Sequence, residues 1–337
     1  MIYPNFISKN KIIGVTAPSD GVTKKEKVFR LENAIKKFNE LGYKVITTDN
    51  VKNTELGRSA KAEIRAKYVN ELYKNNEVDL IICACGGDFL LEILPYINEK
   101  TIKENIKWIQ GYSDPTGLLY YITTKLDIAT IYSDNFTTFG MKNWHKSLVE
   151  NLNILEGNLV LQNSYDKYES THTEYIIGDE EYNLDAEVKW KNLKDEEDIN
   201  ISGRIIGGCL DVLDSMIGTK YDGGKEFIEK YKKDGIIWYF DNCELTSEQV
   251  IRALWKFKVL GYFENVNGII FGRSMTHRSY YDISFKDAII QSIGELNIPI
   301  IYDTDIGHIA PQMTIINGAV ANVISKDGKG RISFELK

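Results

Sequence analysis

The stretch "WIQGYSDPTGLLYYITTKL", residues 108–126, decides the fold. An apolar run typical of a buried strand ends at Gly111, and a helical pattern begins immediately after Pro115. Between them stands Ser113, at the point where the chain turns from strand to helix. A serine at that point is either part of an ordinary turn or a nucleophile presented to a ligand.

The same alternation of strand and helix runs through the first 135 residues. Near-continuous apolar runs such as "KIIGVTAP" and "VDLIICACGG" alternate with amphipathic stretches such as "EKVFRLENAIKKFNELG". Apolar strands of this kind indicate a parallel sheet covered on both faces. Because ligands gather at the carboxyl ends of such strands, "ACGGD" and "GYSDP" are both expected to lie at a binding edge.

Three parts follow from the change of pattern along the chain. Residues 1–150 are predicted to form a doubly wound α/β domain that carries the serine. Residues 151–200 are polar and acidic and read as a connection with a few peripheral strands, with disorder as the weaker alternative. Residues 201–337 mix strands and helices and predict a smaller, partly β-barrel-like α+β domain.

The composition excludes several classes of protein. A net charge of −7 argues against sequence-independent binding of nucleic acid, which needs a basic face, and gives no reason to expect a membrane surface as partner. No basic and apolar leader opens the chain and no apolar run approaches about 20 residues, so a cytoplasmic protein is expected. Four cysteines without ligand spacing predict neither a disulfide scaffold nor a metal site.

The turn around Ser113 has the ingredients of a nucleophile elbow. Asp114 is expected to cap the following helix, and Pro115 suits a first helical position. Ser113 then lies beside the unpaired amides and the positive end of the helix dipole. The second glycine of the G-x-S-x-G pattern is missing, so a plain turn serine remains open on this motif alone.

Two glycines in "CGGDF" add a second element at a strand end. Gly86 and Gly87 allow the backbone to approach a ligand closely and to direct N–H groups at an anion, although a tight turn explains them equally well. A nucleophilic serine also needs a base. Of four histidines, His308 is the best candidate, because it follows an apolar strand in a constrained Gly and Pro loop.

An acid that orients the histidine is the third requirement. Asp241 ends the buried strand "GIIWYFD", and Glu244 follows three residues later. Either side chain could instead serve the first turn of the next helix, a role that suits Glu244 better than Asp241.

Taken together, these segments resemble the LD-carboxypeptidase family, the serine-peptidase family that also includes the microcin C self-immunity peptidases. The resemblance extends from about Ile13 to Val323. The motifs that carry it, in order, are "VTAPSDG", Arg65–Ala66, "CGGDFLLEILPYI", "IQGYSDPTGLL", "GRIIGGCLDVL", "WYFDNCE" and "DTDIGHIAPQMTIINGA".

The resemblance implies a Ser–Glu–His triad on two domains, with Ser113 as nucleophile and His308 as base. It also implies an oxyanion hole built from the backbone N–H groups of Gly87 and Asp114. The acid position falls on Asp241, where the family generally has glutamate. An aspartate is shorter by about 1.5 Å, so the strand or the histidine loop must lie closer, unless Glu244 takes the role or the protein is an inactive relative that only binds its ligand.

The resemblance further implies a substrate that is either a murein tetrapeptide, losing a terminal D-alanine, or an acyl-aspartyl group joined to a nucleotide-like moiety. The long connecting segment, "DTDIGH" and Trp190 favour the second, if Trp190 is exposed and stacks on a base rather than packing between domains. Gly86 and Asp88 are expected to contact substrate, and Arg204 and Arg273 are possible carboxylate anchors. No cofactor or metal is implied, and relatives of this family are often homodimers.

Overall fold

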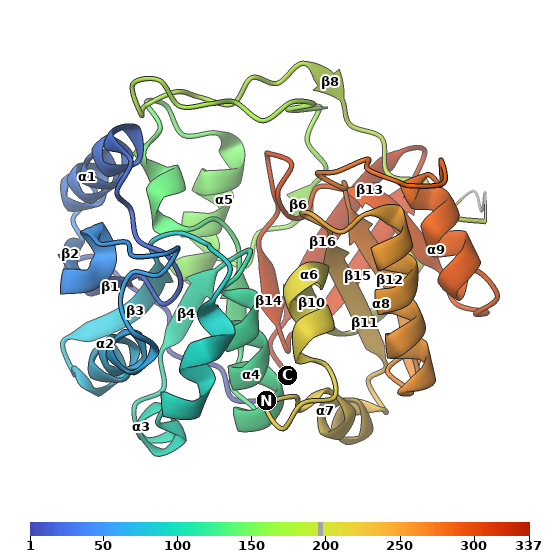
Figure 1. The fold of residues 1–337 in the computed structure, drawn as a ribbon, viewed down its shortest axis with the longest axis horizontal. Coiled ribbons are helices and arrows are strands. Elements are labelled where there is room, and N and C mark those ends of the chain that lie inside the picture. Colours follow the sequence, from blue (N-terminus) through green and yellow to red (C-terminus); the bar gives the residue numbers. More distant parts are fainter. Residues whose placement is uncertain (195–197) are drawn as a thin grey trace.

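The first of two large sheets is the expected parallel sheet. The computed structural model describes residues 1–194 and 198–337, and its first sheet has the strand order β14–β5–β4–β3–β1–β2 (Figure 1). The strands β1 to β5 pair in parallel, and β14 pairs antiparallel with β5. The strands are β1 (Ile12–Thr16), β2 (Lys44–Thr47), β3 (Val78–Cys83), β4 (Trp108–Gly111), β5 (Thr130–Tyr132) and β14 (Ile315–Asn317).

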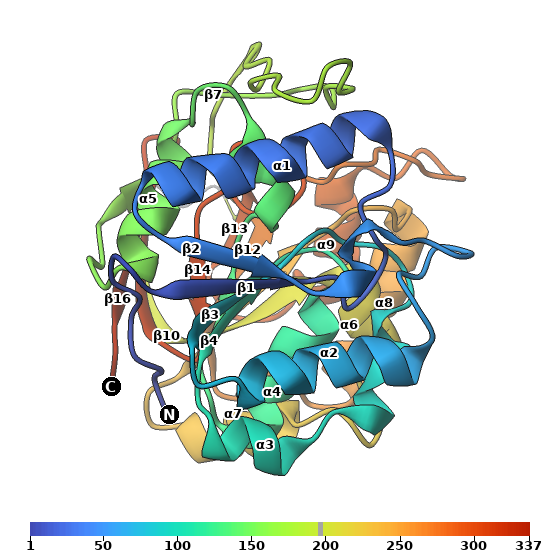
Figure 2. The same cartoon turned by 90° about the vertical axis from the view of Figure 1, so that its left-hand side faces the viewer.

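Helices cover both faces of this sheet. Figure 2 shows α1 and α5 on one face and α2, α3 and α4 on the other. This double cover explains why every residue of β4 is buried. The α-helices are α1 (Lys25–Glu40), α2 (Ala62–Lys74), α3 (Glu99–Glu104), α4 (Thr116–Leu126) and α5 (Lys146–Leu155), with 3₁₀ turns η1 (Asp49–Lys52), η2 (Leu90–Tyr96) and η3 (Phe136–Gly140).

The second sheet is mixed and has the order β6–β16–β15–β10–β11–β12–β13–β9. Its centre, β10 to β13, is parallel, whereas β15 and β16 form an antiparallel hairpin beside β10. The strands are β6 (Gln162–Asn163), β9 (Lys191–Asn192), β10 (Asp198–Cys209), β11 (Ile236–Asp241), β12 (Val266–Gly272), β13 (Ile300–Thr304), β15 (Val320–Lys326) and β16 (Lys329–Glu335). The helices of this part are α6 (Leu210–Met216), α7 (Gly224–Tyr231), α8 (Ser247–Val259) and α9 (Phe285–Ile293). The predicted class, an α/β domain followed by a domain rich in strands, is confirmed.

Strand β14 connects the two parts. It follows β13 of the second sheet in sequence but pairs with β5 of the first sheet. The segment between them contributes β6 and β9 to the edges of the second sheet and holds a separate pair, β7 (Lys167–Tyr168) and β8 (Ala186–Glu187). Residues 195–197 of the predicted connection lie outside the described residues. The domain limits 1–150, 151–200 and 201–337 stay a prediction.

The topology brings strand ends from both sheets to one place. The chain leaves β3 and β4 at "ACGGD" and "YSD", and it leaves β11 and β13 at Asp241 and at the loop that holds His308. Loops at the carboxyl ends of parallel strands are where an open α/β sheet binds ligands. No helix in the described part of the chain is long and apolar enough to cross a membrane.

Candidate active site

Ser113 lies on a strained turn between β4 and α4. Its φ of 69° is in the left-handed region, which is uncommon for residues other than glycine and costs free energy that the surrounding structure must offset. The loop after β3 lies against this turn, because a Cβ on Gly86 would lie 3.1 Å from the Ser113 Oγ. These two features are those of a nucleophile elbow, in which a strained turn exposes the serine hydroxyl.

The expected capping role of Asp114 is wrong. Helix α4 begins at Thr116 after Pro115, and no side chain caps it. The buried Asp114 carboxylate instead accepts hydrogen bonds from the Ser19 hydroxyl and from the Leu90 N–H, the latter at 2.8 Å. The Asp114 side chain therefore holds the "CGGDF" loop beside the serine.

Arg65 also holds the "CGGDF" loop in place. Its buried guanidinium donates to the carbonyl oxygens of Pro18 and Phe89 and forms an ion pair with Glu92. Within the described part of the chain, the amide N–H groups of Gly87 and Asp114 have no acceptor. Two free donors on either side of a serine hydroxyl are what an oxyanion hole requires.

His308 is the histidine that the fold brings to the serine. Its Nε2 lies 2.9 Å from the Ser113 Oγ, although 195 residues separate the two in sequence. Among the other histidines, His145 caps α5 and both His172 and His277 are exposed. The ring of Tyr112 packs against the His308 ring, with centroids 5.1 Å apart.

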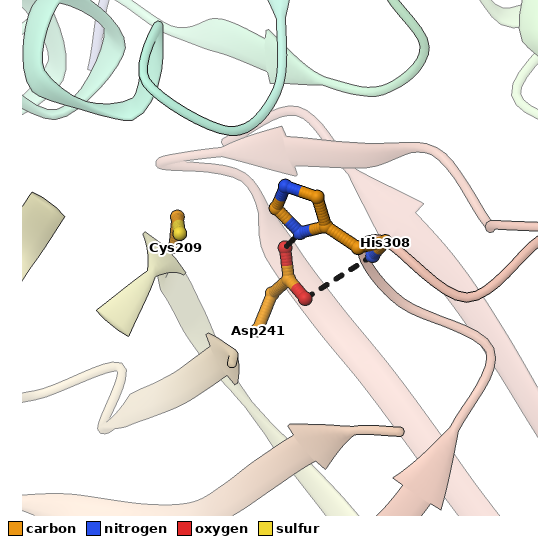
Figure 3. Close-up of side chains that lie close together, drawn as sticks. All are labelled: Cys209, Asp241 and His308. Carbon is orange, nitrogen blue, oxygen red and sulfur yellow. Dashed lines mark hydrogen bonds and ion pairs between the residues drawn. The ribbon is translucent and has the colours of Figure 1, made fainter. Parts of the chain in front are cut away.

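Asp241 orients His308 with both carboxylate oxygens. Figure 3 shows this carboxylate directed at the histidine, where Oδ2 lies 2.6 Å from Nδ1 and Oδ1 accepts the His308 backbone N–H at 3.2 Å. A carboxylate only accepts, so Nδ1 carries the hydrogen and Nε2 of the neutral ring is free to accept from Ser113. Serine, histidine and aspartate thus form one chain of hydrogen bonds in the order that nucleophilic catalysis needs.

Tyr132, which sequence reasoning missed, links the two lobes of this arrangement. Its buried hydroxyl donates to Asp241 Oδ2 at 2.7 Å and accepts from the Ser113 backbone N–H at 3.4 Å. The signal in the sequence is only that Tyr132 ends β5, the strand beside β4. Pairing of those two strands places Tyr132 opposite Gly111, two residues before the serine.

Comparisons with known proteins identify the fold and the family. Residues 13–133 match the family model described as the LD-carboxypeptidase N-terminal domain, and residues 202–323 match the LD-carboxypeptidase C-terminal domain. The chain belongs to the LD-carboxypeptidase family.

Two curated relatives cover the two branches of this family. A probable murein peptide carboxypeptidase of Bacillus subtilis is 23% identical over 322 residues, which is 94% of this chain and 90% of the relative. The microcin C7 self-immunity protein MccF of Escherichia coli is 25% identical over 305 residues, 87% of this chain and 84% of the relative.

Solved structures share the fold. The MccF-like protein of Bacillus anthracis is 23% identical, with a TM-score of 0.84 and full coverage of both chains. The microcin C7 self-immunity protein in complex with aspartyl sulfamoyl adenosine is 22% identical, with a TM-score of 0.80 over all of this chain and 99% of that one.

At Asp241, where the family resemblance led us to expect glutamate, the histidine loop approaches closely. Gly307 has a φ of 95°, and a Cβ on it would lie 2.0 Å from the Asp241 carboxyl carbon. The shorter aspartate therefore reaches His308 because the loop comes close. Glu244 is exposed, and no hydrogen bond joins its carboxylate to His308, so the alternative acid is not in place.

Replacing Gly307 by alanine should test this close approach. The left-handed conformation costs alanine about 1–2 kcal/mol, and the clash with the buried carboxylate adds to it, so we expect about 3 kcal/mol or more off the free energy of unfolding. Gly328→Ala is the matched control, because Gly328 has a φ of 74° but its nearest neighbours are 3.9 Å away. Denaturant unfolding measures both, and equal losses in the two variants would contradict the close approach.

Replacing Tyr132 by phenylalanine should lower kcat about ten- to a hundredfold while leaving the fold intact, because one hydrogen bond to the Asp241 carboxylate is lost. Tyr239→Phe is the matched control, since the buried Tyr239 packs on Tyr132 but donates to Asn317. Steady-state kinetics on both variants would contradict this role if kcat fell equally in the two.

Three residues expected to contact substrate do not lie at the site. Trp190 is 2% exposed and donates from Nε1 to Asp305, so it packs in the interior and the base-stacking interpretation is wrong. Arg204 is buried in an ion pair with Asp234 and donates to the backbone carbonyl oxygens of Gly318 and Lys337. Arg273 is buried in an ion pair with Asp305. Neither arginine is placed to anchor a substrate carboxylate.

Two cavities flank the serine instead. One, of about 350 Å³, is lined by Ser113, Gly87, Asp88 and Glu244 among others. The second, of about 420 Å³, is lined by Gly86 and Tyr112 and by Lys24 and Lys27 at the start of α1. The second cavity is therefore lined by two lysines, Lys24 and Lys27, which the sequence analysis did not predict as site residues.

The site also groups Cys209, Asp241 and His308, whose potential ligand atoms lie within 4.8 Å of one another (Figure 3). Two ligands of one tetrahedral zinc, each about 2.0–2.3 Å from the metal, lie roughly 3.3 Å or more apart. The 2.6 Å between Asp241 Oδ2 and His308 Nδ1 is shorter than that and is the distance of a charge-assisted hydrogen bond. The geometry thus suits proton transfer better than metal binding.

Proposed function

We propose that this chain is a serine peptidase or amidase that hydrolyses an amide or amide-like bond near the end of a peptide or aminoacyl-nucleotide. The observation that carries the proposal is the hydrogen-bonded chain from Ser113 Oγ through His308 to Asp241, at 2.9 and 2.6 Å. Membership of the LD-carboxypeptidase family supports a hydrolase.

The mechanism assigns one task to each group. Ser113 Oγ attacks the scissile carbonyl carbon while His308 Nε2 takes the hydroxyl proton, and Asp241 stabilises the imidazolium that forms. The amides of Gly87 and Asp114 hold the oxyanion. His308 then gives its proton to the leaving group, the tetrahedral intermediate collapses, and an acyl-serine remains. A water that gives its proton to His308 attacks the acyl-serine, releases the acyl group and restores the serine.

The pKa of His308 sets the pH at which this residue can act as a base. Burial lowers the pKa, but the charge of Asp241 and its hydrogen bond outweigh burial, and the pKa is raised well above the ordinary value of 6.5. A histidine that serves as a base must be neutral, so the activity should be lost as the pH falls through this raised pKa.

For the substrate we propose an aminoacyl-nucleotide, as in the self-immunity branch, with the murein tetrapeptide as the second candidate. A microcin self-immunity protein and a probable murein peptide carboxypeptidase both align over most of the chain. A structural neighbour has been solved in complex with aspartyl sulfamoyl adenosine. Lys24 and Lys27 at the cavity beside Tyr112 favour a substrate with an anionic part such as a nucleotide phosphate. The buried Trp190 removes one of the sequence arguments for this branch.

A decayed protein that only binds its ligand is the remaining alternative. The experiment that separates them offers wild type and His308→Ala both a murein tetrapeptide and aspartyl sulfamoyl adenosine, with products identified by mass spectrometry. We expect wild type to release either D-alanine or the free nucleoside analogue, and His308→Ala to release neither. Ligand-dependent stabilisation of both proteins without any product would instead establish a binding protein.

We also propose a cytoplasmic location and a homodimer, both from the family resemblance. Sedimentation of the purified protein tests the second of these, and a mass of 38.5 kDa in solution would contradict it.

A further inference from the structure

A small cavity of about 40 Å³ lies beside His308, within the site but distinct from the serine. The rings of Tyr112 and His308 form one wall, and the other walls come from Asp134 after β5, Glu169 after β7, and Gln312. It shares Tyr112, Thr138, His172 and Tyr175 with the 420 Å³ cavity that adjoins it. A space of this size holds one small polar group.

Two polar side-chain atoms in the walls of this cavity lack a hydrogen-bond partner among the described residues. Asp134 is 4% exposed and Gln312 is 3% exposed, yet neither Asp134 Oδ2 nor Gln312 Oε1 receives a hydrogen bond in the described part of the chain. A buried acceptor left without a donor is costly, and native structures leave few of them unless a ligand or a bound water supplies the bond. Both atoms are acceptors, so the missing group is a donor.

The charge around the cavity decides between donors. Asp134 and Glu169 are both acidic, and no lysine or arginine is among the described residues that line the space. The nearby Arg30 donates to the carbonyl oxygens of Thr137, Thr138 and Glu180, and its positive charge lowers the pKa of Asp134. Burial raises the pKa of Asp134 to about 6, although hydrogen bonds from the Gln312 and Thr138 side chains lower it.

A protonated primary amine fits these walls better than a neutral group. An ammonium offers three donors and a positive charge to the acceptors of Asp134, Gln312 and Glu169, whereas a hydroxyl offers one donor and water carries no charge. We propose that this cavity binds the protonated primary amine of the substrate, held next to His308 by Asp134 and Gln312. The inference rests on the proposed function and narrows it to substrates that carry a free primary amine.

The test compares ligands that differ only in this amine. The first pair is aspartyl sulfamoyl adenosine with a free and with an acetylated α-amine. The second pair is a murein-type tetrapeptide, with lysine as its third residue, carrying a free or an acetylated lysine amine. Titration calorimetry with Ser113→Ala, which should retain ligand without turnover, measures all four dissociation constants. We expect acetylation to weaken binding about ten- to a hundredfold in at least one pair.

The same titrations on Asp134→Asn in the Ser113→Ala background locate the effect. The ratio between free and acetylated ligand should fall towards one, and Gln312→Leu should reduce it in part, which covers the case that Asp134→Asn folds poorly. Asp222→Asn is the matched control: this buried acid accepts from Tyr120, Tyr262 and two backbone amides elsewhere in the fold, and the ratio should not change.

Three results would overturn the amine site: equal binding of free and acetylated ligands, a ratio that survives in Asp134→Asn, and no binding of any of the four ligands. Turnover is followed separately in the protein with Ser113. Hydrolysis of free and acetylated ligands at equal rates and with equal binding would contradict the amine site alone. Weaker binding of the acetylated ligands without any hydrolysis would contradict the proposed function alone.

Discussion

Asp241→Asn should lower kcat about ten-thousandfold and leave the free energy of unfolding nearly unchanged. Asparagine has nearly the shape of aspartate, so the buried position is still filled. Its side chain, however, no longer offers two equivalent charged acceptors to His308. The neutral histidine then loses the preference for a hydrogen on Nδ1, and its imidazolium loses the neighbouring charge that stabilises it.

The pH profile of the residual activity should move as well. Asp241 raises the pKa of His308 above its ordinary value, and that effect is removed with the charge, while burial continues to lower the pKa. The acidic limb of kcat/KM, which we expect above pH 6.5 in wild type, should therefore shift to lower pH in the variant. Rates measured across pH 5–9 on both proteins give the two limbs.

Asp222→Asn is the control for the loss of a buried carboxylate outside the site. The acidic limb of kcat/KM in this variant should lie at the same pH as in wild type. A variant Asp241→Asn with near wild-type kcat would show that His308 is oriented by another group. If wild type and Asp241→Asn both showed no turnover, the result would favour the alternative of a decayed protein that only binds its ligand.

Much of the site was predictable because strand ends carry it. Ser113 stands where a buried strand turns into a helix, and His308 and Asp241 follow apolar strands in the same way. The family resemblance then supplied their roles. The geometry adds what no local pattern contains, namely that the three side chains meet across 195 residues of sequence.

The residues that failed share one cause. Trp190, Arg204 and Arg273 were chosen for the chemistry of their side chains, but exposure depends on what the rest of the chain packs against them. Trp190 is covered by the β15–β16 hairpin, where a Cβ on Gly330 would lie 2.1 Å from its ring. A sequence pattern contains no information on such long-range cover.

The consequence of aspartate in place of glutamate was likewise open in the sequence. The structure has Gly307 of the histidine loop in close contact with Asp241 and has Glu244 exposed, whereas the inactive relative stays an alternative. Tyr132 and the amine cavity could not be anticipated, because Asp134 and Gln312 are 178 residues apart and only the paired sheets bring them together.

The measurement that tests the central claim most directly is the turnover of Ser113→Ala beside wild type, on the murein tetrapeptide and on aspartyl sulfamoyl adenosine. We expect kcat/KM on the substrate that wild type cleaves to fall by about ten-thousandfold or more, because the nucleophile is removed. Circular dichroism and thermal unfolding should remain those of wild type, and binding of that substrate should persist. Unchanged hydrolysis by a folded Ser113→Ala protein would contradict the assignment of Ser113 as nucleophile and, with it, the proposed mechanism.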